Sequence, residues 1–353
     1  MAARLRDVAE RTGVSVKTVS NVVNGHRHVS DPTRQRVQAA IDEMGYRPNL
    51  SARGLRSGRS GVIALALPEL DNPYFAELAG FVVQAADAHG LTVLVDQTDG
   101  LVERETLVMT GIRGPLIDGL ILSPIATDAE QLAGSVGRVP IVLLGEKVSH
   151  GPVDHVAIDN VAAARLATEH LLDVGCTHVV AIGDLPHSPQ GSGAAQLRRH
   201  GYEEALRRRG MAVDERFVMA VPSWRRQDGA SAMAALLDAA RRSDGVFCFN
   251  DTLALGVLRA LAERGLRVPE DVAVIGIDDV EDGRFAVPSL STVAPDKEQI
   301  ARTAVQMLVD RMHVDQDAGP RDVTAGFRLV RRESTDRFWR LRARRAGTKV
   351  GLR

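Results

Sequence analysis

The apolar residues at the start of the chain recur with the period of short amphipathic helices. Leu5, Val8 and Ala9 follow i, i+3, i+4 spacing, so they share one helical face. Gly13 suits a tight turn that needs a positive φ angle, and the hydroxyl of Ser15 can cap the helix that follows. The pattern therefore predicts two short helices joined by a tight turn at Gly13.

The second of these helices has one apolar and one polar face. Val16, Val19 and Val23 are expected to line its inner face, and a third helix is expected between Ser30, which can cap it, and Gly45. A unit of this size is too small to hold a pocket, but it can place one helix in the major groove of DNA. The residues left on the outer face are of the types that bind bases and phosphates: Lys17, Thr18, Ser20 and Asn21.

From Gly61 onward, continuous apolar strands alternate with helices, which is typical of parallel sheets covered on both faces. The strands are expected at 62–67, 91–96, 119–122, 141–144, 179–183, 217–221, 246–249 and, as the last, 272–277. The helices are expected near 74–89, 103–113, 160–174, 196–209, 228–240 and 251–264. This order predicts two α/β lobes, with a ligand bound between them at the carboxyl ends of the strands.

Candidate ligand-binding residues lie at or just past these strand ends, except Arg198, which lies near the start of a predicted helix. Arg and Asp bond vicinal hydroxyls, and an aromatic face covers the apolar face of a sugar ring. Phe75 is equally suited to the core, and the alternative role for Asn250 and Asp278 is to cap the turns that follow them. The strand-end candidates are Asn72, Tyr74, Phe75, Ser123, Trp224, Asn250 and Asp278. They indicate a small polar metabolite, with a sugar as the first expectation.

Charge separates the two parts of the chain. Residues 1–60 hold eleven Lys and Arg against five Asp and Glu, a net charge of +6, whereas the whole chain carries −1. A basic head on an acidic body is the electrostatic pattern of a nucleic-acid binder with a separate regulatory part. Residues 337–353 add seven basic residues and no acidic residue, and we expect a disordered tail that attracts phosphate or has no function.

These motifs resemble the lactose-repressor (LacI) family of bacterial transcription regulators, over residues 1 to about 334. In the head, the resemblance lies in Val8-Ala9, Gly13-Val14-Ser15, Thr18-Val19-Ser20, Val22, Asn24-Gly25 and Gly45-Tyr46-Arg47-Pro48-Asn49. In the body, it lies in Asp71–Phe75, Asp118–Pro124, Asn250-Asp251, Val268–Asp279 and Leu290–Val293. The resemblance implies a helix-turn-helix head on a two-lobed, periplasmic-binding-protein-like body with parallel sheets, an α/β fold overall.

The resemblance also implies roles for single residues. Val16, Lys17 and Asn21 stand where the family reads bases, and Asn at the last of these positions favours adenine where many members carry Arg. Phosphate contacts are implied for Ser15, Thr18, Ser20 and Asn24, and an effector contact for Arg198. In the linker, Leu55 stands where the family wedges a Leu into the minor groove, and Ala52 would let two hinge helices pack closely. A plain flexible tether is the alternative for this linker.

Four segments follow from these observations. Residues 1–47 form the DNA-binding head, 48–60 the hinge, 61–336 the two-lobed body that binds effector and dimerises, and 337–353 the basic tail. No apolar run approaches the ~18 residues of a membrane helix, and no signal peptide is recognisable at the N-terminus. The two cysteines, Cys176 and Cys248, fall in or near buried elements and fit a reducing cytoplasm.

No catalytic constellation, metal site or cofactor motif is recognisable, so we expect neither an enzyme nor a metal or cofactor. We expect a cytoplasmic, ligand-responsive regulator, a repressor that binds near-palindromic operator DNA as a homodimer and does not contact membranes. Its effector would be a small metabolite, a sugar first, held between the lobes. The alternatives are a sugar-binding receptor protein without a DNA-regulatory role, and an α/β enzyme that processes sugars or nucleotides.

Overall fold

A computed structural model describes residues 3–23, 28–46, 59–110, 116–134, 139–148, 151–186, 193–313 and 319–336. The chain forms two compact units, Met1–Gly61 and Val62–Arg353, and we describe each by itself. We call the first unit the head and the second the body. The fold class expected from the sequence, an α-helical head and an α/β body with parallel sheets, is confirmed.

The head contains the three predicted helices, α1 (Leu5–Thr12), α2 (Val16–Val23) and α3 (Asp31–Met44). Gly13 follows α1 at φ 67° and Gly45 follows α3 at φ 58°, so both glycines adopt the left-handed conformation that ends a helix. The inner face of α2 differs from the prediction. Val19 and Val22 are buried, whereas Val16, the first residue of the helix, is 42% exposed.

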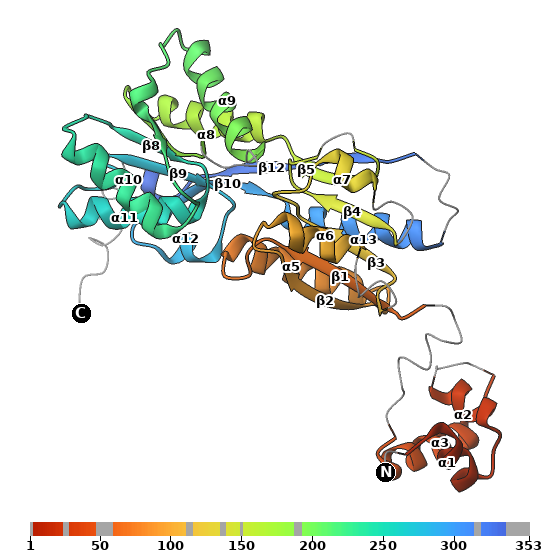
Figure 1. The fold of residues 1–353 in the computed structure, drawn as a ribbon. Helices are drawn as coiled ribbons and strands as arrows, with labels where there is room; N and C mark the ends of the chain where they lie inside the picture. Colours follow the sequence, from red (N-terminus) through yellow and green to blue (C-terminus); the bar gives the residue numbers. More distant parts are fainter. Residues whose placement is uncertain are drawn as a thin grey trace, which may run out of the picture. The chain divides into compact units, whose positions relative to one another are not determined.

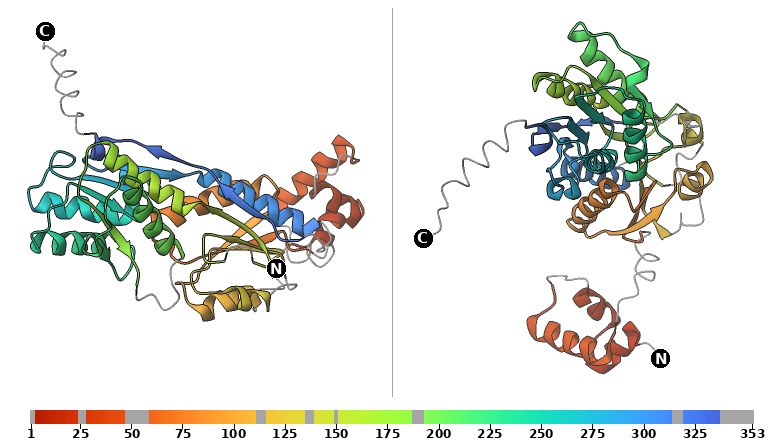
Figure 2. Two further views of the ribbon diagram at one scale, coloured as in Figure 1. Left: turned by 90° about the horizontal axis from the view of Figure 1, so that it is seen from above. Right: turned by 90° about the vertical axis from the view of Figure 1, so that its left-hand side faces the viewer.

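Two six-stranded sheets form the body, one in each lobe (Figure 1 and Figure 2). The N-lobe sheet has the order β11-β5-β4-β3-β1-β2, and all its pairs are parallel. Its strands are β1 (Val62–Leu67), β2 (Thr92–Gln97), β3 (Gly119–Leu122), β4 (Ile141–Leu144), β5 (Asp154–Ile158) and β11 (Asp322–Ala325). Its helices are α5 (Pro73–Asp87), α6 (Val102–Thr110), α7 (Ala129–Ala133) and α13 (Lys297–His313).

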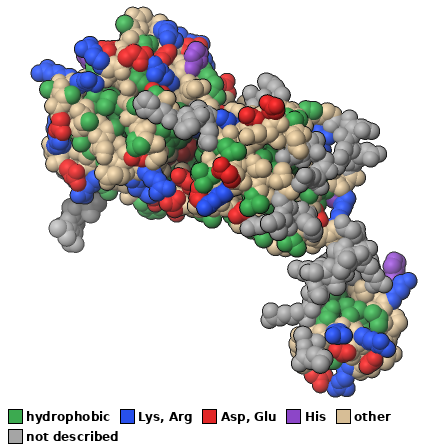
Figure 3. Space-filling model, in the orientation of Figure 1, with side chains coloured by type: hydrophobic (Ala, Val, Ile, Leu, Met, Phe, Trp, Pro, Cys, Tyr) green, Lys and Arg blue, Asp and Glu red, His purple; other side chains and the backbone are tan. Residues whose placement is uncertain are grey.

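The C-lobe sheet has the order β12-β10-β9-β8-β6-β7, in which only the β10–β12 pair is antiparallel. Its strands are β6 (Val179–Asp184), β7 (Val218–Ala220), β8 (Gly245–Cys248), β9 (Ala273–Ile277), β10 (Ser291–Pro295) and β12 (Phe327–Val330). Its helices are α8 (Asn160–Asp173), α9 (Gly193–Arg208), α10 (Arg226–Asp238), α11 (Asp251–Glu263) and α12 (Glu281–Phe285), with short 3-10 turns at Glu215–Phe217 and Glu333–Thr335. Acidic and basic side chains alternate on the visible face of this lobe (Figure 3).

The prediction that the strand ending at Ile277 is the last one is wrong, because β10, β11 and β12 follow it. The chain crosses between the lobes three times: from β5 to α8, from β10 to α13, and from β11 to β12. Helix α13 packs on α5 and on the N-lobe sheet although it follows the whole C-lobe in sequence. These crossings place the starts of α8 and α13 at the junction of the lobes.

Candidate functional site

A cavity of about 830 Å³ lies between the two lobes. It is lined by residues that follow the carboxyl ends of strands in both sheets, which is where ligands bind in open parallel sheets. All the candidate ligand residues line it: Asn72, Tyr74, Phe75, Ser123, Arg198, Trp224, Asn250 and Asp278. The fold therefore brings together side chains that are more than 200 positions apart in the sequence.

The N-lobe wall is organised by the start of α5. The side chain of Asn72 caps this helix, because its Oδ1 accepts a hydrogen bond from the backbone N–H of Tyr74 at 3.1 Å. The rings of Tyr74 and Phe75 meet edge to face, with centroids 5.3 Å apart. Burial, together with the charge of Asp278, raises the pKa of Tyr74, so its phenol stays a neutral hydrogen-bond donor. Ser123, at the end of β3, is buried opposite.

On the C-lobe wall, Arg198 is 6% exposed and fixed on three sides. Its Nε donates to Oδ1 of Asn160 at 2.7 Å, and another guanidinium nitrogen donates to the carbonyl of Phe249. Its guanidinium carbon lies 5.1 Å from the centre of the Trp224 ring. Trp224 in turn donates from its indole N–H to the carbonyl of Gly183 at 2.8 Å. A planar cation and an aromatic face are thus both presented to the cavity.

The carboxyl ends of β8 and β9 supply Asn250 and Asp278. The side chain of Asn250 caps α11 by accepting from the N–H of Leu253 at 2.8 Å, so the capping alternative holds for it while it also lines the cavity. Asp278 is 5% exposed, and its carboxylate accepts no hydrogen bond from the part of the chain that the structure describes. Burial raises the pKa of Asp278 to about 8, against the opposing effect of the Arg198 charge.

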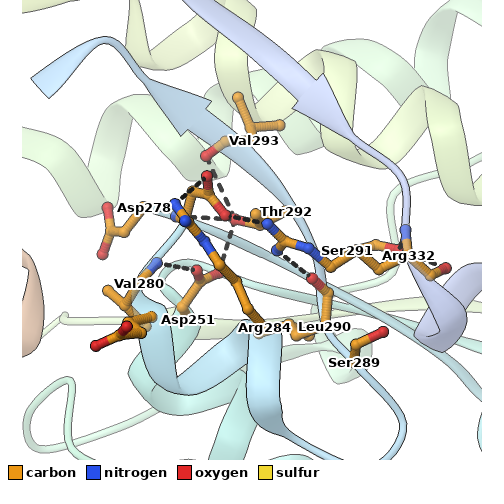
Figure 4. Close-up of polar contacts among 12 residues, drawn as sticks. Asp251, Asp278, Val280, Arg284, Ser289, Leu290, Ser291, Thr292, Val293 and Arg332 are labelled. Atoms are coloured by element: carbon orange, nitrogen blue, oxygen red, sulfur yellow. Dashed lines mark hydrogen bonds and ion pairs between the residues drawn. The ribbon is translucent and has the colours of Figure 1, made fainter.

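A buried polar network supports the backbone around Asp278 (Figure 4). Asp251, at the start of α11, accepts from the Thr292 hydroxyl at 2.7 Å and from the N–H of Val280 at 3.1 Å. Burial raises the pKa of Asp251 to about 6. The N–H of Asp278 itself donates to the carbonyl of Val293 at 2.9 Å. These hydrogen bonds fix the backbone that carries the Asp278 carboxylate.

Sequence reasoning missed two residues beside Arg198. Glu146 lines the cavity just past β4, and its carboxylate accepts from the side-chain amide of Asn160. Asn160 therefore links Glu146 to Arg198. The rule that found the other candidates applies to Glu146 as well, since it follows the predicted strand at 141–144. Asn160 gave no such signal, because it begins a helix on the far side of a chain crossing.

In the head, α2 presents a polar face to solvent. Ser15 Oγ accepts from the N–H of Thr18 at 3.1 Å and lies 2.9 Å from its hydroxyl. Ser15, Val16 and Lys17 are exposed, whereas Thr18, Ser20 and Asn21 are half-buried. The other candidate DNA contacts, Asn24, Ala52 and Leu55, lie outside the described residues, as does the basic segment 337–353.

Within the described part of the chain, no group of three or more His, Cys, Asp or Glu side chains could hold a metal ion. No helix among the described residues is long and apolar enough to cross a membrane.

A small helical head with a polar recognition face, joined to a two-lobed body with a large cavity, defines the class of ligand-responsive DNA-binding regulators. Comparison with known proteins agrees. Residues 4–49 match the model of the bacterial regulatory proteins of the lacI family, and residues 168–335 match that of the periplasmic binding protein-like domain. The chain belongs to the lacI family of bacterial regulatory proteins.

Relatives match along most of the chain. The ribose operon repressor of Halalkalibacterium halodurans is 32% identical over 87% of this chain and 90% of its own length. The structure of a transcriptional regulator of the LacI family from Sanguibacter keddieii is 50% identical, with a TM-score of 0.73, over 79% of this chain and all of that one. The lac repressor dimer bound to operator and the anti-inducer ONPF is 28% identical, with a TM-score of 0.81, over 95% of this chain and 99% of that one.

Proposed function

We propose that this regulator is a repressor that binds a near-palindromic operator as a homodimer and responds to a sugar bound between its lobes. The observation that carries the proposal is the cavity of about 830 Å³, into which both lobes contribute hydrogen-bonding side chains and aromatic rings. The relatives support it, since one is a ribose operon repressor and another is a repressor dimer on its operator. The relatives are regulators, and we propose that this chain likewise has no catalytic activity.

The charges that line the cavity favour a neutral, polyhydroxylated effector. Its acidic side chains are Glu69, Asp99, Glu146 and Asp278, the last of which keeps its proton at pH 7, against the basic Lys147 and Arg198. Arg198 already donates to an amide oxygen and a carbonyl, so a phosphate or carboxylate ligand would meet an excess of acceptors. A sugar offers hydroxyls that donate to the acids and accept from the arginine, while the Trp224 ring covers its C–H face.

In the proposed mechanism, the head binds the operator and effector binding in the body changes the affinity of that binding. The exposed side chains of Val16 and Lys17, with Asn21, read base edges, while Ser15, Thr18, Ser20 and Asn24 bind phosphates. Ala52 and Leu55 belong to the hinge, where Leu55 would enter the minor groove. The effector changes operator affinity to the extent that it binds the two arrangements of the lobes with different affinity.

The first experiment is selection of bound duplexes from a random DNA library by the full chain at near-physiological salt. Enrichment of a two-fold symmetric site of roughly two helical turns is the expected result. Salt-sensitive binding with no enriched sequence would mean either that specific binding needs a co-ligand or that the head does not read sequence, and the second would favour a sugar-binding receptor protein.

The second experiment measures the melting temperature of the full chain with neutral monosaccharides, D-ribose first, and with their phosphate esters. A ligand that binds only the folded state raises the melting temperature, so we expect a rise with a neutral sugar and none with its phosphate. A larger rise with the phosphate would contradict the proposed effector class.

A further inference from the structure

The segment that carries Asp278 is held by two residues of the opposite lobe. Asp278 has a φ angle of 125° and Asp279 one of 52°, both in a region that side-chain-bearing residues rarely adopt. Such a conformation persists only where the surroundings determine it. The residues that contact this segment from the N-lobe therefore bear directly on where the Asp278 carboxylate points.

Lys297 is the first of these residues. It begins α13 at the crossing from β10, and only 7% of its side chain is exposed. Its ammonium donates to the carbonyl of Asp278 at 2.8 Å and to that of Asp279 at 3.1 Å. It also pairs with the carboxylate of Glu77 and lies 5.8 Å from the centre of the Tyr74 ring. A single buried cation thus contacts both walls of the cavity.

Glu77 completes the contact from α5. Besides pairing with Lys297, its carboxylate accepts from the backbone N–H of Glu281, the first residue of α12, at 2.8 Å. The N-lobe pair therefore binds carbonyl groups at one end of the segment 278–281 and an N–H group at the other. Figure 1 shows α12 near the start of α5, where this contact is made.

An ionic contact between the lobes is more exposed than Lys297. Arg225, in the C-lobe, reaches Glu69 at 3.4 Å and Asp71 at 3.5 Å in the N-lobe, but 58% of its side chain is exposed. Exposed pairs contribute little, whereas a buried charge that loses its partner is strongly unfavourable. The hydrogen bonds of the buried Glu77 and Lys297 to the segment 278–281 are therefore the more costly of these contacts to lose.

We propose that Glu77 and Lys297 are positioning residues that hold the segment 278–281 against the N-lobe and thereby fix both the lobe arrangement and the aim of Asp278. The proposal depends on the proposed function only in taking the cavity as the effector site. An arrangement of the lobes that separates α5 from α12 must break the hydrogen bond from the N–H of Glu281 to the Glu77 carboxylate. The apparent effector affinity is then the intrinsic affinity multiplied by the fraction of molecules in which these contacts are intact, so breaking them lowers it.

The test measures the distance between the lobes in the full chain without effector or DNA, so that it does not depend on the identity of either. Spin labels are attached at two exposed positions, through Glu103→Cys on α6 and Arg259→Cys on α11. The distribution of distances between the two labels is measured by pulsed electron paramagnetic resonance. Cys176 and Cys248 are buried and do not compete for the label. Refolding with excess unlabelled chain makes pairs between subunits rare.

The variants are Lys297→Met, Glu77→Gln and, as a matched control, Glu298→Gln, which changes the exposed neighbour on α13. We expect a broader distribution shifted to longer distances in the first two variants and the wild-type distribution in the control. Lys297→Arg keeps the positive charge and hydrogen-bond donors, so its distribution should lie closer to that of the wild type than the distribution of Lys297→Met does. If Lys297→Met fails to fold, Glu77→Gln still tests the proposal. Wild-type distributions in folded Glu77→Gln would overturn the proposal.

Discussion

Replacing Asp278 with asparagine is expected to stabilise the effector-free protein while removing its response to effector. The carboxylate is buried, its pKa is raised from 3.8 to about 8, and it accepts no hydrogen bond from the described residues. Because the folded-state pKa lies above the unfolded one, the ionised form opposes folding. This unfavourable effect is full above pH 8 and disappears as the pH falls below about 4.

The magnitude follows from the two pKa values. One pKa unit corresponds to about 1.4 kcal/mol. At pH 7 the carboxyl group is ionised in the unfolded chain and protonated in the folded protein, and this difference lowers the free energy of unfolding by about 4 kcal/mol. At pH 5 the same calculation gives less than about 2 kcal/mol. The neutral amide of asparagine lacks this dependence, so the advantage of the variant should be larger at pH 7 than at pH 5.

The assay is urea unfolding of the full chain, wild type and Asp278→Asn, at pH 7 and pH 5, followed by effector titration of both proteins. The expected result is a higher free energy of unfolding for the variant at pH 7, a smaller difference at pH 5, and no effector response. A variant less stable than wild type at pH 7, or a difference independent of pH, would refute the argument from burial. An unchanged effector response would remove Asp278 from the cavity's binding residues.

Three other substitutions test separate parts of the molecule. Lys17→Ala with Asn21→Ala should abolish operator selectivity while leaving effector binding, measured by duplex selection and calorimetry; retained selectivity would refute the assignment of the head. Arg198→Lys keeps the charge but loses the planar stack, so effector affinity measured by calorimetry should fall tenfold or more; an unchanged affinity would contradict this contact. Glu105→Gln should lower the free energy of unfolding, measured in urea, by about 2–3 kcal/mol, because this buried carboxylate accepts hydrogen bonds from the N–H groups of loop 125–127. An unchanged unfolding midpoint would show that these hydrogen bonds do not depend on the charge of Glu105.

Local patterns were sufficient for the head and for most of the body. The turn at Gly13 and the helix end at Gly45 depend on glycine's access to the left-handed region, which is a property of the residue itself. The buried central strands are continuous apolar runs, so β1, β3, β4 and β9 could be predicted closely. The cavity residues were found because parallel strands all point their carboxyl ends to the same edge of a sheet.

The polar strands could not be found in this way. β5 begins with Asp154, which is fully buried only because Arg311 and Arg321 each pair with it at 2.7 Å from elements far along the chain. β11 is an edge strand that carries Asp322 and Thr324, so it lacks an apolar run. The polar residues of these two strands weaken the hydrophobic pattern, and the partners that stabilise the strands lie far away in the sequence.

The sequence by itself determined most of the helices and apolar strands, the class of the protein and the strand ends that line the cavity, because each of these depends on residues close together in the chain. The tertiary structure decided which distant residues meet. Glu77 and Lys297 are 220 positions apart, and Glu146 reaches Arg198 only through Asn160. These contacts exist because the chain crosses between the lobes three times, and the pairing of charges across such crossings depends on the path of the whole chain.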